Sequence, residues 1–229
     1  TIDKANGNGS LEGYEDGDRR TQSEYDPLGR QIRTIDPVGT VTESTYSLCG
    51  NLVTQVVDFG DDEHLNLTTR TEYDALGRMT RTTDPEGHYL RLKYDSQNNV
   101  IRQTAYDNAD TPLSQTRWTY DLGKRVTRVA QMFDPASTDE PDTSVDRVTD
   151  YVYHPGGGLG AGQISEQTVY DGINARTTAL TYDGIGRLWR TSLPKDPGQN
   201  YEEAEYDPNT GRMAARVVSD PLGVRRFEF

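Results

Sequence analysis

The chain has 229 residues, a formal net charge of −13 and a pI near 4.6. This acidity argues against nucleic acid or an anionic membrane surface as a partner, and no run of about 18 apolar residues is present to form a transmembrane helix. Leu, Ile, Val and Phe make up only 42 of the 229 residues, so we expect a thin layer with little solid core.

The first 24 residues form a lead-in rich in Gly, Asn and Asp, with room for an initial strand. We expect residues 1–18 to be poorly ordered. Residues 4–15 come close to a calcium-binding loop, but Lys4 occupies the first ligand position and no helical pattern flanks it, so we favour a flexible loop and predict no metal site. Because the chain begins at Thr1 without an initiator Met or a signal-peptide pattern, we expect it to be a fragment of a longer protein.

Turn signals recur at short intervals from residue 25 to residue 229, which predicts a long antiparallel β-meander of repeated hairpins. The Asp-Pro-x-Gly tetrapeptide suits a type I turn, because Asp accepts local backbone hydrogen bonds, Pro fixes φ and Gly suits the fourth position. Between the turns lie runs rich in Thr, Val, Ile, Tyr and Arg, the composition of strands. Such runs include Arg30–Ile35, Thr40–Tyr46, Arg78–Thr83, His88–Tyr94 and Val100–Tyr106. We predict about sixteen strands and no helix.

Three segments interrupt the regular spacing of the turns: Asp58–Asn66, Asp134–Ser144 and His154–Gly162. The first two are acidic and the third is rich in glycine. We interpret all three as long hairpin loops within one ribbon, and not as linkers between domains, because strand-like runs resume after each of them.

The hairpin pattern is a sequence repeat. Tyr-Asp-x-Leu-Gly-Arg occurs at Tyr25–Arg30 and again at Tyr73–Arg78, and residues 25–55 share 13 of 31 positions with residues 73–103. Looser copies follow at Tyr94, Tyr120, Tyr182 and Tyr206. The candidate site residues are the repeat positions Tyr25, Asp26, Gly29, Arg30, Tyr73, Asp74, Gly77, Arg78, Tyr182, Asp183, Gly186, Arg187, Tyr206, Asp207, Gly211 and Arg212.

The Tyr, Asp and Arg side chains of the repeat have two interpretations. They form a ladder that stiffens the sheet, or they present an aromatic surface that binds a ligand. We favour the ladder, because repeated positions in stacked architectures mostly bury surface against their neighbours. The Arg after Gly can reach the turn Asp or lie over a Tyr ring, and we expect Tyr rings of adjacent repeats to pack together. In the copy at Tyr120, we assign the Arg position to Lys124, which would lack the planar fork of Arg.

The repeat resembles the YD repeat of Rhs proteins, which is also found in the C components of bacterial Tc toxins and in animal teneurins. Tyr-Asp, Gly-Arg and Asp-Pro-x-Gly carry the resemblance, and it extends from about Tyr25 to the C-terminus. The resemblance implies a curved β-ribbon or part of a spiral, hollow shell. In bacterial members, that shell encloses a C-terminal toxin domain. The parent protein would then be secreted or presented at the cell surface.

We therefore expect a non-enzymatic structural segment without a cofactor, whose partners are other repeats of the parent chain and an enclosed toxin domain. The alternative is a secreted or surface adhesin, a polysaccharide-binding or self-associating fibre module that uses exposed tyrosines with Trp118 or Trp189. An enzyme would need a nucleophile with a base or a carboxylate pair in a cleft, and neither is recognisable in the sequence. Some Rhs-type shells cleave themselves at an Asp-Pro-x-Gly-Leu stretch, from which Asp220–Val224 departs at its last residue.

Overall fold

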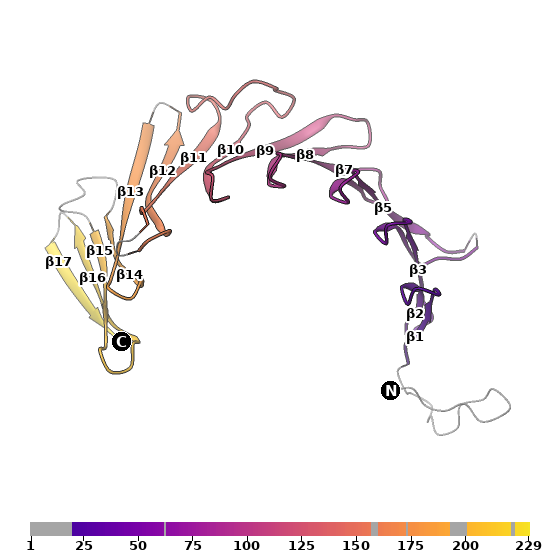
Figure 1. Cartoon of the computed structure of the whole chain (residues 1–229), viewed down its shortest axis with the longest axis horizontal. Helices are drawn as coiled ribbons and strands as arrows, with labels where there is room; N and C mark the ends of the chain where they lie inside the picture. The colour runs from indigo at the N-terminus through magenta and orange to yellow at the C-terminus, as the bar shows by residue number, and fades with distance from the viewer. Residues whose placement is uncertain (1–19, 62, 157–159, 173, 193–200, 221–222) are drawn as a thin grey trace. The chain divides into compact units, whose positions relative to one another are not determined.

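Every regular element of the described chain is a β-strand (Figure 1). The computed structural model describes residues 20–229 except 62, 157–159, 173, 193–200 and 221–222. Seventeen strands and no helix occur in this part of the chain, so no described helix could cross a membrane. The predicted all-β antiparallel meander is confirmed. The possible calcium loop at 4–15 lies outside the described residues, as does most of the 1–24 lead-in.

The chain divides into two units, residues 1–89 and 90–229. In the first unit, each strand pairs antiparallel with the next one along the chain. These strands are β1 (Gln22–Tyr25), β2 (Gln31–Ile35), β3 (Val41–Tyr46), β4 (Leu52–Val57), β5 (Leu67–Tyr73) and β6 (Met79–Thr83). Strand β1 spans the predicted boundary between the 1–24 lead-in and the ribbon. The turns β1–β2, β3–β4 and β5–β6 share one edge of the sheet, and the other turns of this unit lie at the opposite edge.

In the second unit, the strands from β8 onward pair in the same way, each with its successor. Strand β7 (Tyr89–Tyr94) begins at the boundary between the units. The others are β8 (Val100–Tyr106), β9 (Pro112–Tyr120), β10 (Val126–Gln131), β11 (Arg147–Tyr153), β12 (Ile164–Asp171), β13 (Asn174–Tyr182), β14 (Leu188–Ser192), β15 (Tyr201–Tyr206), β16 (Met213–Asp220) and β17 (Gly223–Glu228). The three irregular segments connect β4 to β5, β10 to β11 and β11 to β12, all of them antiparallel neighbours, so they are hairpin loops as predicted.

The short turns are type I turns followed by a residue with positive φ. In the β1–β2 turn, the N–H of Gly29 donates to the carbonyl of Asp26 at 2.9 Å, and Gly29 has a φ of 77°. This left-handed position adds one residue to the loop and shifts the strand register between Glu24 and Tyr25. The recurrence of Gly in the sequence therefore marks a backbone conformation that residues with a Cβ adopt only at a cost.

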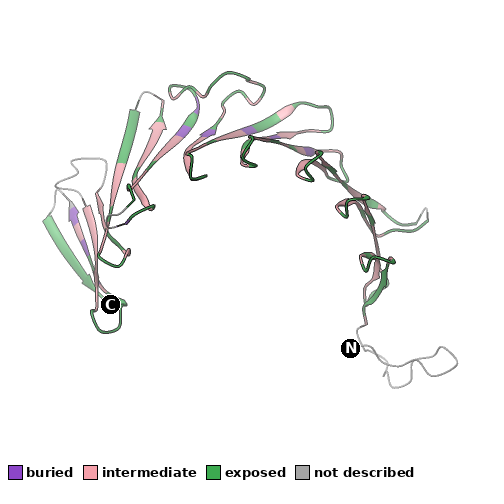
Figure 2. Cartoon of the chain, in the orientation of Figure 1, coloured by how far each residue is buried: buried purple, intermediate pink, exposed green. Residues whose placement is uncertain are grey.

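Few side chains are fully buried, and most strand residues are half-exposed (Figure 2). The main buried group lies in the second unit near the β10–β11 loop and includes Ala130, Val148, Gln115 and Asp146. Gln115 donates from Nε2 to the carbonyl of Pro135 at 2.7 Å, and Asp146 accepts from the N–H of Phe133 at 2.7 Å. The loop is thus fastened by buried polar groups. The expectation of a thin layer agrees with this burial pattern, because the fold holds together mainly through strand pairing and polar contacts.

Candidate functional site: the Tyr-Asp-Arg turns

The aspartate of each repeat organises its own turn. Asp26 Oδ1 accepts hydrogen bonds from the backbone N–H groups of Leu28 and Arg30, both at 2.9 Å. Asp is suited to this position because its short carboxylate reaches the backbone two residues on. Asp74, Asp121 and Asp183 accept the equivalent pairs of bonds.

The arginine that follows the turn forms an ion pair with the same carboxylate. Arg30 approaches Asp26 Oδ2 with both Nε and Nη2, each at 2.6 Å. The same ion pair joins Asp74 to Arg78, Asp121 to Arg125 and Asp183 to Arg187. The backbone and side-chain hydrogen bonds from Arg30 hold the pKa of Asp26 below its usual value, and for Asp74 the side-chain bond from Arg78 is the main cause of the lower pKa.

The same guanidinium also lies over the tyrosine of the next hairpin. The Arg30 Cζ is 4.8 Å from the ring centre of Tyr46, and the Arg187 Cζ is 4.0 Å from that of Tyr206. Arg125 covers Tyr153 at 4.4 Å. Neighbouring repeats are therefore joined at these positions by cation–π contacts, and the prediction that the Arg after Gly lies over a Tyr ring is confirmed.

Each of these tyrosines also donates its hydroxyl back to the preceding hairpin. The acceptor is the backbone carbonyl of the first residue of the preceding return strand. Tyr46 reaches Gln31 at 2.8 Å, and Tyr182 reaches Ile164 at 2.9 Å. The same bond links Tyr73 to Leu52, Tyr120 to Val100, Tyr153 to Val126 and Tyr206 to Leu188.

These bonds combine into one recurring arrangement, which we call the inter-hairpin contact: the Asp and Arg of one turn with the Tyr that begins the next turn of the same edge. Arg30 adds a bond from Nη1 to the carbonyl of Ser47 at 3.2 Å, and Arg187 adds one to Gly211 at 3.1 Å. The guanidinium therefore contacts its own turn, the next ring and the next turn at once. This geometry joins neighbouring hairpins. It leaves few hydrogen-bonding groups of the Asp, Arg and Tyr side chains available to a ligand.

Two turns differ from the sequence assignment. Lys124 does not take the Arg position of its repeat. It has a φ of 62° and occupies the left-handed position that Gly fills elsewhere, while Arg125 pairs with Asp121. The turn at Asp207 is one residue longer, with Thr210 donating its N–H to Asp207 Oδ1 at 2.7 Å. Among the described residues, no ion pair joins Arg212 to Asp207. In the other repeats the paired Arg lies four residues after the turn Asp, and the same spacing from Asp121 would have identified Arg125.

The sequence assignment also missed partners of the repeat residues. Tyr46 follows the same spacing as Tyr94 in the 48-residue repeat, which was the signal that could have found it. Inside the strands, Arg81 lies over the ring of Tyr89 at 3.7 Å and Arg190 over that of Tyr201 at 3.8 Å. Arg128 makes a two-pronged ion pair with Asp150 on the neighbouring strand at 2.6 and 2.7 Å. These pairs depend on which residues face each other across neighbouring strands, and this strand register could not be predicted from the sequence.

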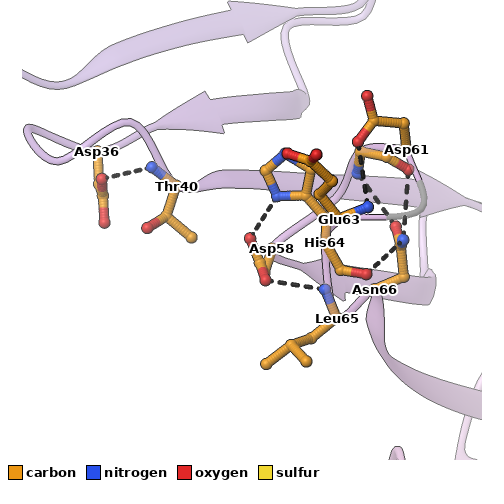
Figure 3. Close-up of polar contacts among 9 residues, drawn as sticks. Asp36, Thr40, Asp58, Asp61, Glu63, His64, Leu65 and Asn66 are labelled. Carbon is orange, nitrogen blue, oxygen red and sulfur yellow. Dashed lines mark hydrogen bonds and ion pairs between the residues drawn. The ribbon is translucent and has the colours of Figure 1, made fainter.

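The β4–β5 loop contains a second polar cluster (Figure 3). His64 Nδ1 lies 2.7 Å from Asp58 Oδ1, and the N–H of Leu65 donates to Asp58 Oδ2 at 2.9 Å. Asn66 closes the loop by accepting from the N–H of Gly60 at 3.1 Å. The hydrogen bond with the Asp58 carboxylate is the main cause that raises the pKa of His64, and the same bond lowers the pKa of Asp58.

Other candidate chemistry is sparse. In the described part of the chain, no three His, Cys, Asp or Glu side chains are grouped to hold a metal ion. Cys49 is exposed on the β3–β4 turn. His154 packs edge-on against Tyr182, with ring centres 5.7 Å apart. Trp118 is half-buried and Trp189 is exposed beside a small hollow of about 170 Å³.

Residues 25–63, 61–89 and 73–111 match the RHS repeat family model. The matched segment, residues 25–111, thus resembles RHS repeats. The matched segment includes the inter-hairpin contacts of Arg30 with Tyr46 and of Tyr73 with Leu52. Beyond it, Asp121 and Asp183 form turns of the same design with Arg125 and Arg187. The RHS-repeat character predicted from the sequence is confirmed for residues 25–111.

Solved structures similar to the chain include two Tc toxin complexes. The TcdB2-TccC3-Cdc42 structure aligns at 13% identity with a TM-score of 0.47, and the alignment covers 94% of this chain and 14% of that one. The TcdB2-TccC3 structure aligns at 14% identity with a TM-score of 0.47, covering 94% and 15%. The chain thus spans about a seventh of those proteins. No curated protein matches its sequence.

Proposed function

We propose that this chain is a non-enzymatic wall segment of an exported RHS-repeat protein, in which residues 25–229 are a continuous repeat ribbon that helps to enclose a C-terminal toxin or effector domain. The partners of the segment are other repeats of the same protein and the enclosed domain. Nucleic acid and the membrane interior are not among them, which is consistent with the net charge of −13.

The observation that carries the proposal is the inter-hairpin contact. Asp, Arg and Tyr are residue types that often serve binding or catalysis, yet here they satisfy one another between successive hairpins. Arg187 alone contacts Asp183, Tyr206 and the carbonyl of Gly211. A wall needs a sheet that is mechanically continuous, and it does not need a cleft. A thin sheet with few buried residues also exposes two polar faces, as a partition between cargo and solvent would.

The proposal is tested in the longer protein that contains this segment. Cryo-EM of that protein would show residues 25–229 as part of a closed wall around internal density. In parallel, the R125A/R187A variant breaks two inter-hairpin contacts, and R176A is the matched control because no described acidic side chain pairs with Arg176. We expect added protease to cleave the enclosed domain faster in R125A/R187A only. An open ribbon by cryo-EM, or equal cleavage in all three proteins, contradicts the proposal.

A polysaccharide-binding surface is the second candidate, and one observation favours it. Trp189 is 41% exposed and lines the same hollow as Leu188 and Tyr206. Sugars stack on such aromatic faces. However, Arg187 already covers the ring of Tyr206, which reduces the free aromatic area. Tryptophan fluorescence that shifts on adding polysaccharide, and does so less in W189A, would favour this candidate over the wall.

A further inference from the structure

One edge of the first unit carries a row of exposed leucines. Leu28, Leu48 and Leu76 lie at the tips of the three turns of this edge and are 77%, 106% and 73% exposed. Leu28 and Leu76 are the third residues of their turns, and Leu48 is the second. Because the turns β1–β2, β3–β4 and β5–β6 lie at the same sheet edge, two strands apart, the leucines recur roughly every 9–10 Å. We call this row the leucine edge.

The leucine edge has no net charge. In the first and third turns, Asp26 is paired with Arg30 and Asp74 with Arg78. The middle turn, residues 47–51, contains no charged residue. In a chain with a net charge of −13, this edge is therefore a neutral and apolar strip that can approach an identical strip without repulsion.

The opposite edge of the same unit is strongly acidic. Its turns, at residues 36–40, 58–66 and 84–88, contain no Lys or Arg. Their described acidic side chains are Asp36, Asp58, Asp61, Glu63, Asp84 and Glu86. Two copies of this edge would repel each other. The first unit therefore has one edge that can associate with the same edge of a second copy, and one edge that would repel its counterpart.

A hollow lies along the leucine edge and could receive an apolar side chain. It has a volume of about 860 Å³ and opens between the β3–β4 turn and the β5–β6 turn. Ser47, Cys49, Asn51 and Val53 line it on one side. Residues 71–77 line it on the other, with Tyr73 and Leu76 next to the acidic Glu72 and Asp74. Leu76 therefore stands beside a hollow that can receive a leucine of an identical strip.

The geometry points to the leucine edge as a self-association surface that receives the same edge of a second copy of this chain. The neutral charge and the spacing of the strip decide the occupant, because an identical strip meets no repulsion and has the same interval between its turns. Two-fold symmetry would bring each edge against itself, with Leu48 near the centre. This inference concerns the edge alone and stands or fails independently of the proposed wall function.

The contact would be small. Three leucines and their turn neighbours on each side bury less than a standard interface of about 1,600 Å². We therefore expect a reversible dimer that depends on protein concentration. The second unit also carries exposed aliphatic residues in its turns, Leu122 and Ile185, which are 95% and 77% exposed. A test must therefore report on the first unit specifically.

Cys49 provides that report, because it is the single cysteine of the chain and lies next to Leu48 in the row. The 229-residue chain is treated with a homobifunctional maleimide over a series of protein concentrations, and the dimer is quantified on a denaturing gel. We compare the wild type, L28S/L48S/L76S, L48E and, as the control on the acidic edge, V38S/L65S. All of these side chains are exposed, and circular dichroism confirms that each variant keeps its β structure.

We expect the dimer cross-linked through Cys49 to increase with concentration in the wild type and in V38S/L65S. It should fall several-fold in L28S/L48S/L76S and in L48E, which places like charges across the two-fold axis. Sedimentation equilibrium should show the same order of association. A wild-type yield no higher than that of L28S/L48S/L76S overturns the proposal, and so does a loss of cross-linking in V38S/L65S alone.

Discussion

Removing the tyrosine hydroxyls of the inter-hairpin contact should destabilise the sheet while leaving its rings in place. In Y153F and Y182F, the carbonyls of Val126 and Ile164 lose donors that lie at 2.7 and 2.9 Å. A hydrogen bond of this kind contributes about 0.5–1.5 kcal/mol to the free energy of unfolding. The two bonds lie in different hairpins and share no partner, so their losses should add to about 2 kcal/mol in the double variant.

Urea unfolding followed by circular dichroism measures this loss as a lower midpoint with an unchanged slope. Y25F is the matched control, because Tyr25 is 60% exposed and makes no described hydrogen bond through its hydroxyl. It should unfold like the wild type. If Y153F and Y182F also unfold like the wild type, the hydroxyl bonds do not hold the hairpins together and the argument for cohesion is wrong.

The same phenols give the prediction a pH dependence. Burial is the main cause that raises the pKa of Tyr153 and of Tyr182 above the ordinary value of 10.0. Folding therefore favours the protonated phenol, and this stabilisation is complete below pH 10.0 and is lost as the pH rises through the higher pKa of the folded state. In the double Phe variant, the free energy of unfolding should therefore fall less between pH 7 and alkaline pH than it does in the wild type.

Three further predictions concern other contacts. R187K keeps the charge but loses the planar stack on the next tyrosine, so it should cost about 0.5–1 kcal/mol in thermal unfolding, whereas R212K should change little. K124G should stabilise the chain by less than about 1 kcal/mol, because Gly adopts the positive φ of 62° without strain but loses the bond from Lys124 Nζ to the carbonyl of Gln97 at 2.9 Å, and a lower stability than that of the wild type would contradict this. The pKa of His64 is raised by Asp58, so while Asp58 is ionised the pair supports the β4–β5 loop fully below pH 6.5 and less as the pH rises through the pKa of His64 in the folded state. NMR titration of D58N should show a lower pKa for His64.

The sequence predicted the turns well, because a turn depends on local chemistry. Asp-Pro-x-Gly specifies both the hydrogen-bond acceptor and the left-handed residue within a few positions, and Asp36–Gly39 and Asp84–Gly87 form the predicted turns. The strand Val100–Tyr106 has the same bounds in the structure as in the prediction. Local signals of this kind fixed the fold class without any knowledge of long-range contacts.

The contacts between hairpins were harder to predict, because they join residues that are distant in sequence. Tyr153 bonds to Val126, 27 residues earlier, and the sequence gives no such pairing without the strand register. The assignment of Lys124 failed for a local reason. A lysine at a left-handed position breaks the rule that Gly occupies it, so a pattern anchored on Gly123 shifted the cation by one residue.

The thinness of the sheet explains why polar side chains carry its cohesion. A sheet with both faces exposed has no apolar core to hold successive hairpins, so each hairpin must be fastened to the next within the plane of the sheet. Backbone pairing does this along the strands, and the guanidinium and phenol groups do it at the turn edge. The large aliphatic residues are consequently displaced to the turn tips, as at Leu48 and Leu122. In such a protein, substitutions of Arg and Tyr should reduce the free energy of unfolding more than substitutions of Leu, the reverse of the order in a globular domain, and the exposed leucines should instead affect association.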